Sequence, residues 1–168
     1  MKNIIITTFA LLFLGVGQVQ AQKSDKGLQK KILASKAKWE TLKKEYKNCY
    51  TYVTSATSGL GGFTVRTYVT VKKGKVAKAY RITQYTNKKS AREEKKKKLS
   101  KQERSKLKNL DEIYAFAMDE LAKQSPKQNS ITFKVAGNGV ILRAGYTPKN
   151  CMDDCFRGYK IDEIKRLK

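Results

Sequence analysis

Two amphipathic helix patterns, each followed by strand patterns, most limit what this chain can fold into. In the first pattern the apolar residues recur at steps of four, seven, three and four, at Leu28, Ile32, Trp39, Leu42 and Tyr46. That spacing places them on one helical face, while lysines fill the other. We interpret Trp39 as an anchor of the core, because an aromatic residue on such a face is usually buried. The sequence therefore predicts a helix from Leu28 that packs through one side.

Three strand patterns follow this helix, over residues 49–54, 63–71 and 75–85. The first is rich in aromatic and β-branched residues and ends at the glycine-rich breaker 58–62. The second alternates apolar and polar residues, which predicts one face toward the core and one toward water. Lys73-Gly74 is a hairpin turn signal. We expect an antiparallel meander whose third strand has Val76, Tyr80 and Ile82 on one side.

The second helix pattern begins at Asn109, where Glu112 three residues later is the partner of a capping pair. Its apolar stripe consists of Leu110, Ile113, Tyr114, Ala117, Met118 and Leu121. Ser125-Pro126 ends the helix. Strand patterns follow at 131–135, 140–146 and 158–161, whereas the tail also permits a helix, since its apolar residues recur every three positions.

The order of elements is helix, three strands, helix, three strands. Runs of helix and antiparallel strand of this kind are typical of α+β proteins, in which sheet and helices form separate layers. Each half offers one apolar helical face and one half-apolar sheet. We therefore expect a single α+β domain over residues 28–168 in which both halves share one core.

A basic segment interrupts this order at about residues 87–108. Residues 88–108 hold eleven basic and three acidic residues, a net charge of +8. Four consecutive lysines repel one another, so we expect a solvated, partly frayed insertion that adds almost nothing to the core. Its candidate anion contacts are Lys88, Lys89, Arg92, Lys95, Lys96, Lys97, Lys98, Lys101 and Arg104. Such a segment attracts anionic polymers or lipids through counterion release, although the favoured interpretation is that the charge only keeps the protein soluble.

The first 21 residues have the features of a cleavable signal peptide. Lys2 supplies the positive start, residues 4–16 form an apolar run, and cleavage is expected after Ala21. The run is shorter than the roughly 20 residues that a spanning helix needs. We expect an exported chain, periplasmic or secreted, with no transmembrane segment after cleavage and a flexible start at residues 22–27. Loss of Lys2 leaves that chain a charge of +22, which is +23 minus one.

The chain contains three cysteines, and the expected export decides whether they form disulfides. Disulfides persist in oxidising compartments, so a bridge is expected. Cys151 and Cys155 are four residues apart in one loop, which favours their pairing, while a bridge from Cys49 to either of them stays an alternative. The spacing is one residue longer than the redox motif C-x-x-C, so we predict a structural bond.

Enzyme chemistry finds little support in the sequence. The chain contains no histidine, which excludes Ser-His-Asp triads, Cys-His dyads and histidine-ligated metals. The carboxylate pairs Glu40 with Glu45 and Asp111 with Asp119 have no motif that adds a nucleophile or oxyanion donors. We therefore expect no catalytic residues and no cofactor.

Calcium is the one metal that the residues of the last loop suggest. Asn150, Asp153, Asp154 and Asp162 offer the hard oxygens that this ion prefers. They lack the ligand ladder of an EF-hand, and short acidic loops usually form turns that hydrogen-bond their own backbone. The sequence predicts no metal site.

A resemblance adds to this reading. The residues that carry it are the lysine-rich helix with Trp39, Tyr50-x-Tyr52, the hairpin Val69-x-Val71-x-x-Gly74-x-Val76, Leu110-Asp111-Glu112-Ile113 and Gly145-Tyr146. Over most of residues 38–167 the chain resembles small exported bacterial domains of unknown function, with 88–108 as an extra insertion. The resemblance implies export and an α+β domain, and it implies no activity.

These observations predict an exported, non-catalytic binding or structural module that contacts an unknown protein, lipid or glycan of the cell envelope or its surroundings. Nucleic acid is disfavoured because export separates the chain from it. The alternative is a small envelope enzyme that acts without histidine. A binding module should show a surface cluster of aromatic or charged side chains, whereas an enzyme needs a deep pocket in which titratable groups converge.

Overall fold

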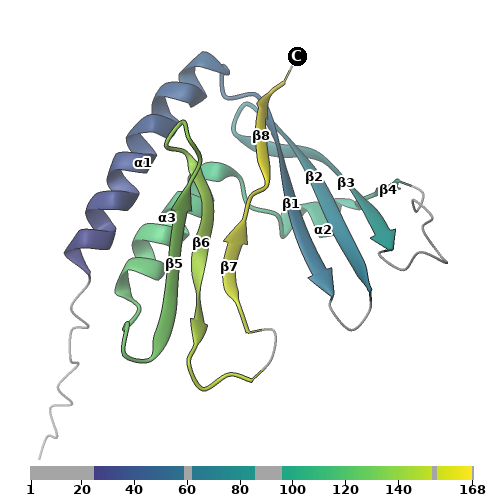
Figure 1. The fold of residues 1–168 in the computed structure, drawn as a ribbon. Helices are drawn as coiled ribbons and strands as arrows, with labels where there is room; N and C mark the ends of the chain where they lie inside the picture. Colours follow the sequence, from purple (N-terminus) through teal and green to yellow (C-terminus); the bar gives the residue numbers. More distant parts are fainter. Residues whose placement is uncertain (1–24, 59–61, 86–95, 153–154, 168) are drawn as a thin grey trace, which may run out of the picture.

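The computed structural model describes residues 25–58, 62–85, 96–152 and 155–167 (Figure 1). The helices are α1 (Lys26–Glu45), α2 (Lys101–Ser105) and α3 (Leu110–Asp119), followed by the 3-10 turn η1 (Leu121–Lys123). The strands are β1 (Tyr50–Ser58), β2 (Phe63–Lys72), β3 (Lys75–Tyr85), β4 (Lys97–Lys98), β5 (Asn129–Val135), β6 (Ile141–Pro148), β7 (Arg157–Lys160) and β8 (Glu163–Arg166). The signal peptide expected at residues 1–21 lies outside the described residues.

The strands form two antiparallel sheets. The five-stranded sheet has the order β4-β3-β2-β1-β8, and the three-stranded sheet has the order β5-β6-β7. One stretch of chain joins them: Ile161 N donates to Leu142 O in the smaller sheet (2.7 Å), and Asp162 N donates to Val53 O in the larger one (2.8 Å). The two sheets therefore lie side by side, with α2 and α3 behind them in Figure 1. Helices and antiparallel sheets in this arrangement confirm the α+β prediction.

The tail of the chain is a strand. Residues 163–166 pair with β1, which places Ile164 opposite Tyr52 on the core side. The spacing of three residues that also permitted a helix is overridden by this pairing, because the strand buries Ile164 and fills the edge of β1.

The first helix begins two residues earlier than its apolar stripe indicates. Asp25 is the N-cap, and its carboxylate accepts from the backbone N–H groups of Gly27 (2.8 Å) and Leu28 (3.1 Å). Lys26 and Gly27 are therefore helical, which corrects the expected flexible stretch 22–27 at its C-terminal end. The stripe itself is confirmed, since Leu28, Ile32 and Trp39 are buried on one face.

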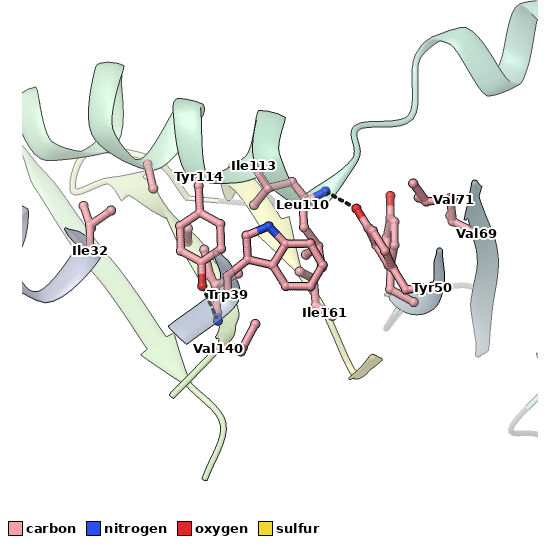
Figure 2. Close-up of a cluster of buried hydrophobic side chains, with 14 of the residues drawn as sticks. Ile32, Trp39, Tyr50, Val69, Val71, Leu110, Ile113, Tyr114, Val140 and Ile161 are labelled. Atoms are coloured by element: carbon pink, nitrogen blue, oxygen red, sulfur yellow. Dashed lines mark hydrogen bonds between the residues drawn. The ribbon is translucent and has the colours of Figure 1, made fainter. Parts of the chain in front are cut away.

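Helices α1 and α3 and both sheets contribute to one core (Figure 2). Trp39 of α1 is fully buried and meets Tyr50 of β1 edge to face, with ring centroids 4.9 Å apart. The Tyr50 hydroxyl accepts from the N–H of Leu110, the first residue of α3 (2.9 Å). The Tyr114 hydroxyl accepts from Ile141 N at the start of β6 (3.0 Å). The expectation of a shared core agrees with this packing.

The third strand departs from its predicted facing. A β-bulge shifts the register between Thr70 and Val71, so that Val76 lies opposite Val71 while Lys78 lies opposite Thr70. The extra residue, Ala77, moves the following side chains to the other face. Tyr80 and Ile82 therefore point away from the core, and the prediction that they share a side with Val76 is wrong.

The end of the basic segment is also part of the fold. Leu99 is 1% exposed within the core, its N–H donates to Ala79 O (3.0 Å), and Leu107 packs against the same core. Ser100 and Glu103 form a capping box that starts α2. The expectation that the insertion adds almost nothing to the core is wrong for residues 96–108, because two leucines among the exposed lysines anchor it. Residues 87–95 carry the rest of that expectation, and they lie outside the described residues.

Candidate functional site

The outer faces of the two sheets carry the candidate site. Residues directly opposite one another on neighbouring strands share a face. In the five-stranded sheet the inner face holds Tyr50, Tyr52, Val69 and Ala79, so the residues between them point outward. The helices α2 and α3 pass on the inner side, and in the part of the chain that the structure describes no helix covers the outer one (Figure 1).

Two tyrosines form a stacked pair on this outer face. Tyr68 and Tyr80 are opposite one another in β2 and β3, and their rings are 4.6 Å apart with an angle of 6° between planes. Lys96 places its Nζ 3.8 Å from the centroid of the Tyr80 ring. Desolvation, with a smaller contribution from Tyr68, raises the pKa of Tyr80 above its usual value. Tyr68 covers one face of the Tyr80 ring and Lys96 covers the other, so the half-buried Tyr68 ring has the remaining aromatic face on which a planar or ring-shaped group could stack.

A row of cations crosses the outer face of the three-stranded sheet. Lys134, Arg143 and Lys160 occupy one register line of β5, β6 and β7. The Arg143 guanidinium lies over the Phe156 ring, 4.4 Å from its centroid, and its Nε is buried with no hydrogen-bond partner among the described residues.

Two opposed glycines permit this stacking. Gly145 and Gly158 are paired in β6 and β7. A Cβ at Gly145 would lie 2.4 Å from the Phe156 ring, and one at Gly158, where φ is +149°, would lie 2.2 Å from Ala144 O. Only glycine admits so close an approach, so these positions hold Phe156 against the sheet beside Arg143.

The two outer faces meet at a polar hollow of about 530 Å³ lined by both sheets. Lys160 Nζ donates to Ser55 Oγ (3.2 Å), which ties the cation row to β1, and Arg66 and Tyr68 lie on the other side of the hollow. The acidic residues there are ion paired: Asp162 is 3.4 Å from Lys160, and Glu163 is 2.7 Å from Lys165. Charge and aromatic surface are thus continuous from β5 to β3.

We call this surface the basic outer face. Its members are Arg66, Tyr68, Lys78, Tyr80, Lys96, Lys98, Lys134, Arg143 and Lys160. Sequence reasoning singled out only Lys96 and Lys98 among them. The signal that it missed is the alternation of Arg66 and Tyr68 with the buried residues of β2, which marks both as outward facing.

The other anion contacts predicted from the sequence are scattered. Lys97 is exposed in β4 and Lys101 is exposed at the start of α2. Arg104 turns back and donates to Leu99 O (2.8 Å), so its role includes holding the segment together. Lys88, Lys89, Arg92 and Lys95 lie outside the described residues.

The carboxylates considered for catalysis do not assemble as pairs. Asp111 accepts from the Trp39 indole N–H (2.8 Å) and from Lys43 Nζ (3.0 Å). Glu40 lies 3.3 Å from the same Lys43 Nζ. Burial is the largest single influence on the pKa of Lys43 and lowers it. The hydrogen bonds and charges of Asp111 and Glu40 together outweigh burial, so the pKa is raised. This cluster joins α1 to α3 beside the core, which is a structural task.

The described residues bring together no group of three or more His, Cys, Asp or Glu side chains that could hold a metal ion. Of the residues weighed for calcium, Asn150 is exposed and Asp162 is ion paired with Lys160. Asp153 and Asp154 lie outside the described part of the chain.

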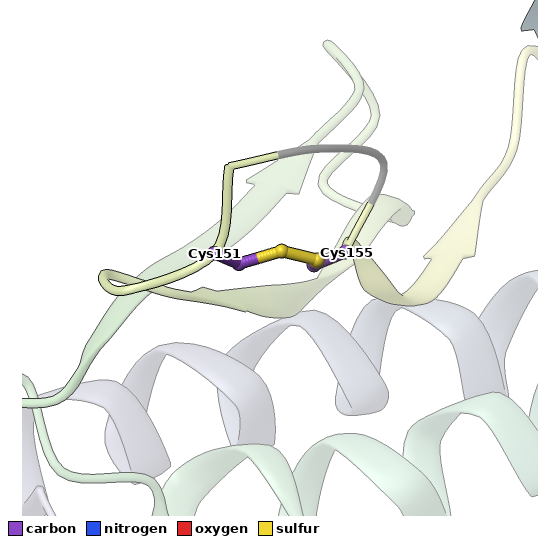
Figure 3. The surroundings of a disulfide bond; sticks show 2 residues. All are labelled: Cys151 and Cys155. Atoms are coloured by element: carbon purple, nitrogen blue, oxygen red, sulfur yellow. A yellow bond between two sulfur atoms is a disulfide. The ribbon is translucent and has the colours of Figure 1, made fainter.

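The structure joins Cys151 and Cys155 in a disulfide, with Cα atoms 6.3 Å apart (Figure 3). This is the pairing that sequence proximity favours. Cys49 is a free, half-buried thiol just before β1. The disulfide closes the loop that leads into β7, close to Phe156 and the cation row.

No family model, no curated protein and no solved structure matches this chain. Among the described residues, no helix is both long and apolar enough to cross a membrane. The resemblance to small exported domains stays a prediction.

Proposed function

We propose that this chain is an exported, non-catalytic module that binds anionic polysaccharides of the cell envelope or its surroundings. The observation that carries this proposal is the basic outer face, where the stacked Tyr68–Tyr80 pair lies among cations. Sugar rings stack on exposed aromatic faces, and carboxylate or sulfate groups pair with Arg and Lys. A long polymer suits a surface that continues across both sheets.

The charge of the whole chain supports the same class of ligand. The formal charge of +23 draws polyanions toward the surface, and the arrangement of cations on one face then supplies selectivity. The polar hollow beside Lys160 offers hydrogen bonds in addition to charge. Asp162 and Glu163 are neutralised by Lys160 and Lys165, which limits repulsion of an anionic ligand.

The test measures binding of fluorescein-labelled alginate, a polymer of uronic acids, to the chain from residue 22 onward. The variant Lys134→Gln/Arg143→Gln/Lys160→Gln should weaken binding by about tenfold or more at low salt, since three contacts are lost. The matched control Lys30→Gln/Lys44→Gln/Lys106→Gln removes the same charge from other exposed positions and should change it by less than about twofold. Equal losses in both variants would show attraction by net charge alone and reject the site.

The aromatic half of the proposal has its own measurement. Tyr68→Ala/Tyr80→Ala should weaken alginate binding at physiological salt, where stacking persists while charge attraction is screened. Anionic phospholipid vesicles carry no polysaccharide, so the double variant should bind them nearly as well as the unchanged protein does. If the double variant lost more binding to vesicles than to alginate, the ligand would be a lipid surface and not a glycan.

Export belongs to the same proposal. A disulfide is compatible with an oxidising compartment, and the signal sequence predicts a mature chain that begins at Gln22. N-terminal mass spectrometry of the protein from bacterial envelope and medium fractions should find that end. Recovery of intact Met1 in the membrane fraction would contradict cleavage.

A further inference from the structure

A second surface, far from the polar hollow, is a groove between α1 and β5. It consists of two adjacent hollows of about 320 and 510 Å³, both lined by Lys31 of α1 and Phe133 of β5. Its floor is apolar, with Ala34 on the helix side and Phe133 and Val135 on the strand side. Val135 is 45% exposed, which is unusual for a large aliphatic side chain beside a core.

The strand that borders this groove is an edge strand. β5 pairs with β6 on one side, and no other described strand pairs with it on the other. Alternate N–H and C=O groups along such an edge are left for a further strand. β5 is seven residues long and contains no proline, and its one charged residue, Lys134, points to the outer face and leaves the groove side apolar.

The rim of the groove is positively charged. Lys31 and Lys38 are exposed residues of α1 that line it. Asp25 is the acidic residue among those that line the two hollows, and its carboxylate is engaged in capping α1. The groove therefore combines an apolar floor, a cationic rim and an open strand edge.

We propose that this groove binds an extended, acidic peptide segment of a protein partner, which adds to β5 as a further strand. Strand addition supplies main-chain hydrogen bonds, and pockets for alternate side chains supply specificity. Apolar side chains of the peptide enter the groove above Phe133 and Ala34, and Asp or Glu residues two positions away, on the same face of the peptide strand, meet Lys31 and Lys38. Residues 27–38 of α1 span about 16 Å, which matches about five residues of an extended chain.

This site is independent of the basic outer face. The groove lies on the inner side of β5, where Phe133 and Val135 point, whereas Lys134 of the outer cation row points the other way. A glycan on the outer face and a peptide in the groove would occupy opposite sides of the same sheet. Failure of either proposal leaves the other standing.

The experiment selects phage-displayed random heptapeptides on the immobilised chain from residue 22 onward. We expect enrichment of sequences in which Asp or Glu stands two residues from an aliphatic residue, which places both side chains on the face that meets the groove. Binding of the enriched synthetic peptide should shift the backbone amide NMR signals of residues 131–135 and should be lost when alternate peptide nitrogens are methylated, because these donate to the strand edge. No enrichment, or equal affinity of the methylated peptide, would overturn the proposal.

Matched variants locate the site. Ala34→Trp fills the groove from an exposed helix position and should weaken peptide binding about tenfold or more, whereas Ala37→Trp, equally exposed but outside the groove, should leave it unchanged. Lys31→Glu/Lys38→Glu should weaken binding more than Lys30→Glu/Lys44→Glu, which makes the same charge change elsewhere on α1. If Ala34→Trp leaves the peptide affinity unchanged, the peptide binds outside this groove.

Discussion

The inner and outer faces of the five-stranded sheet carry the same residue type in opposite settings. On the inner face Tyr50 and Tyr52 are buried, and their hydroxyls are committed: Tyr50 accepts from Leu110 N, and Tyr52 donates to Lys108 O. On the outer face Tyr68 and Tyr80 stack on one another beside Lys96. The inner pair fixes the start of α3 against the sheet, while the outer pair lies outside the core and is only half-buried. Burial, and not residue type, therefore decides whether a tyrosine of this sheet supports the fold.

Replacing one tyrosine on each face tests this contrast directly. Tyr50→Ala removes a fully buried ring that packs on Trp39, and it should lower the free energy of unfolding by about 3–5 kcal/mol. Tyr68→Ala, on the outer face, should cost about 1 kcal/mol or less, mostly through loss of its stack with Tyr80. Urea unfolding followed by circular dichroism measures both. Similar losses would mean that the outer pair also supports the fold.

Leu99 extends the comparison to the basic segment. Leu99→Ala should destabilise the protein by about 2–5 kcal/mol, because the side chain is buried in the core. Lys97→Ala, two residues away and exposed, should stay within about half a kcal/mol. The same urea titration checks the pair. A small loss at Leu99 would restore the view of residues 96–108 as a solvated insertion.

The junction of the helices gives a smaller effect. Asp111→Ala leaves the buried indole N–H of Trp39 and the Lys43 ammonium without their carboxylate, and should cost about 1–3 kcal/mol. Asp119→Ala, exposed at the end of the same helix, is the matched control and should change stability by less than about half a kcal/mol. Thermal unfolding of both variants distinguishes the two positions. Equal, small shifts would remove Asp111 from the junction.

The helices were predictable from the sequence because their signals are local. The stripe from Leu28 to Tyr46 and the capping pair Asn109–Glu112 each specify an element within a few residues, and the structure has both. The hairpin at Lys73-Gly74 is of the same kind, since both residues adopt positive φ.

The candidate site was less predictable because register decides it. The row Lys134, Arg143 and Lys160 exists only when β5, β6 and β7 pair in this register, which no local sequence pattern specifies. The bulge at Ala77 moved Tyr80 to the outer face, which no local pattern announces. Leu99 was overlooked because lysines surround it, although one buried leucine is enough to tie a segment to a core.

Removing a single tyrosine hydroxyl from each face of the sheet should change stability only slightly. Tyr52→Phe removes the donor to Lys108 O and should cost about 0.5–1.5 kcal/mol at neutral pH, whereas Tyr80→Phe should cost less than about half a kcal/mol. Burial, the largest influence, raises the pKa of Tyr52 in the folded state above its ordinary value near 10.

That shift gives the same pair of variants a pH dependence with a defined sign. A raised pKa means that the folded state keeps the Tyr52 proton while the unfolded state releases it at about pH 10. The stability that this proton contributes is therefore complete below pH 10 and is lost as the pH rises above it. Tyr52→Phe lacks this loss, so the difference between wild type and variant should shrink above pH 10 in urea titrations at increasing pH. A difference that stays constant to alkaline pH would show that Tyr52 ionises as readily in the fold as in the unfolded chain, and the hydroxyl would then be no more committed than those of the outer pair.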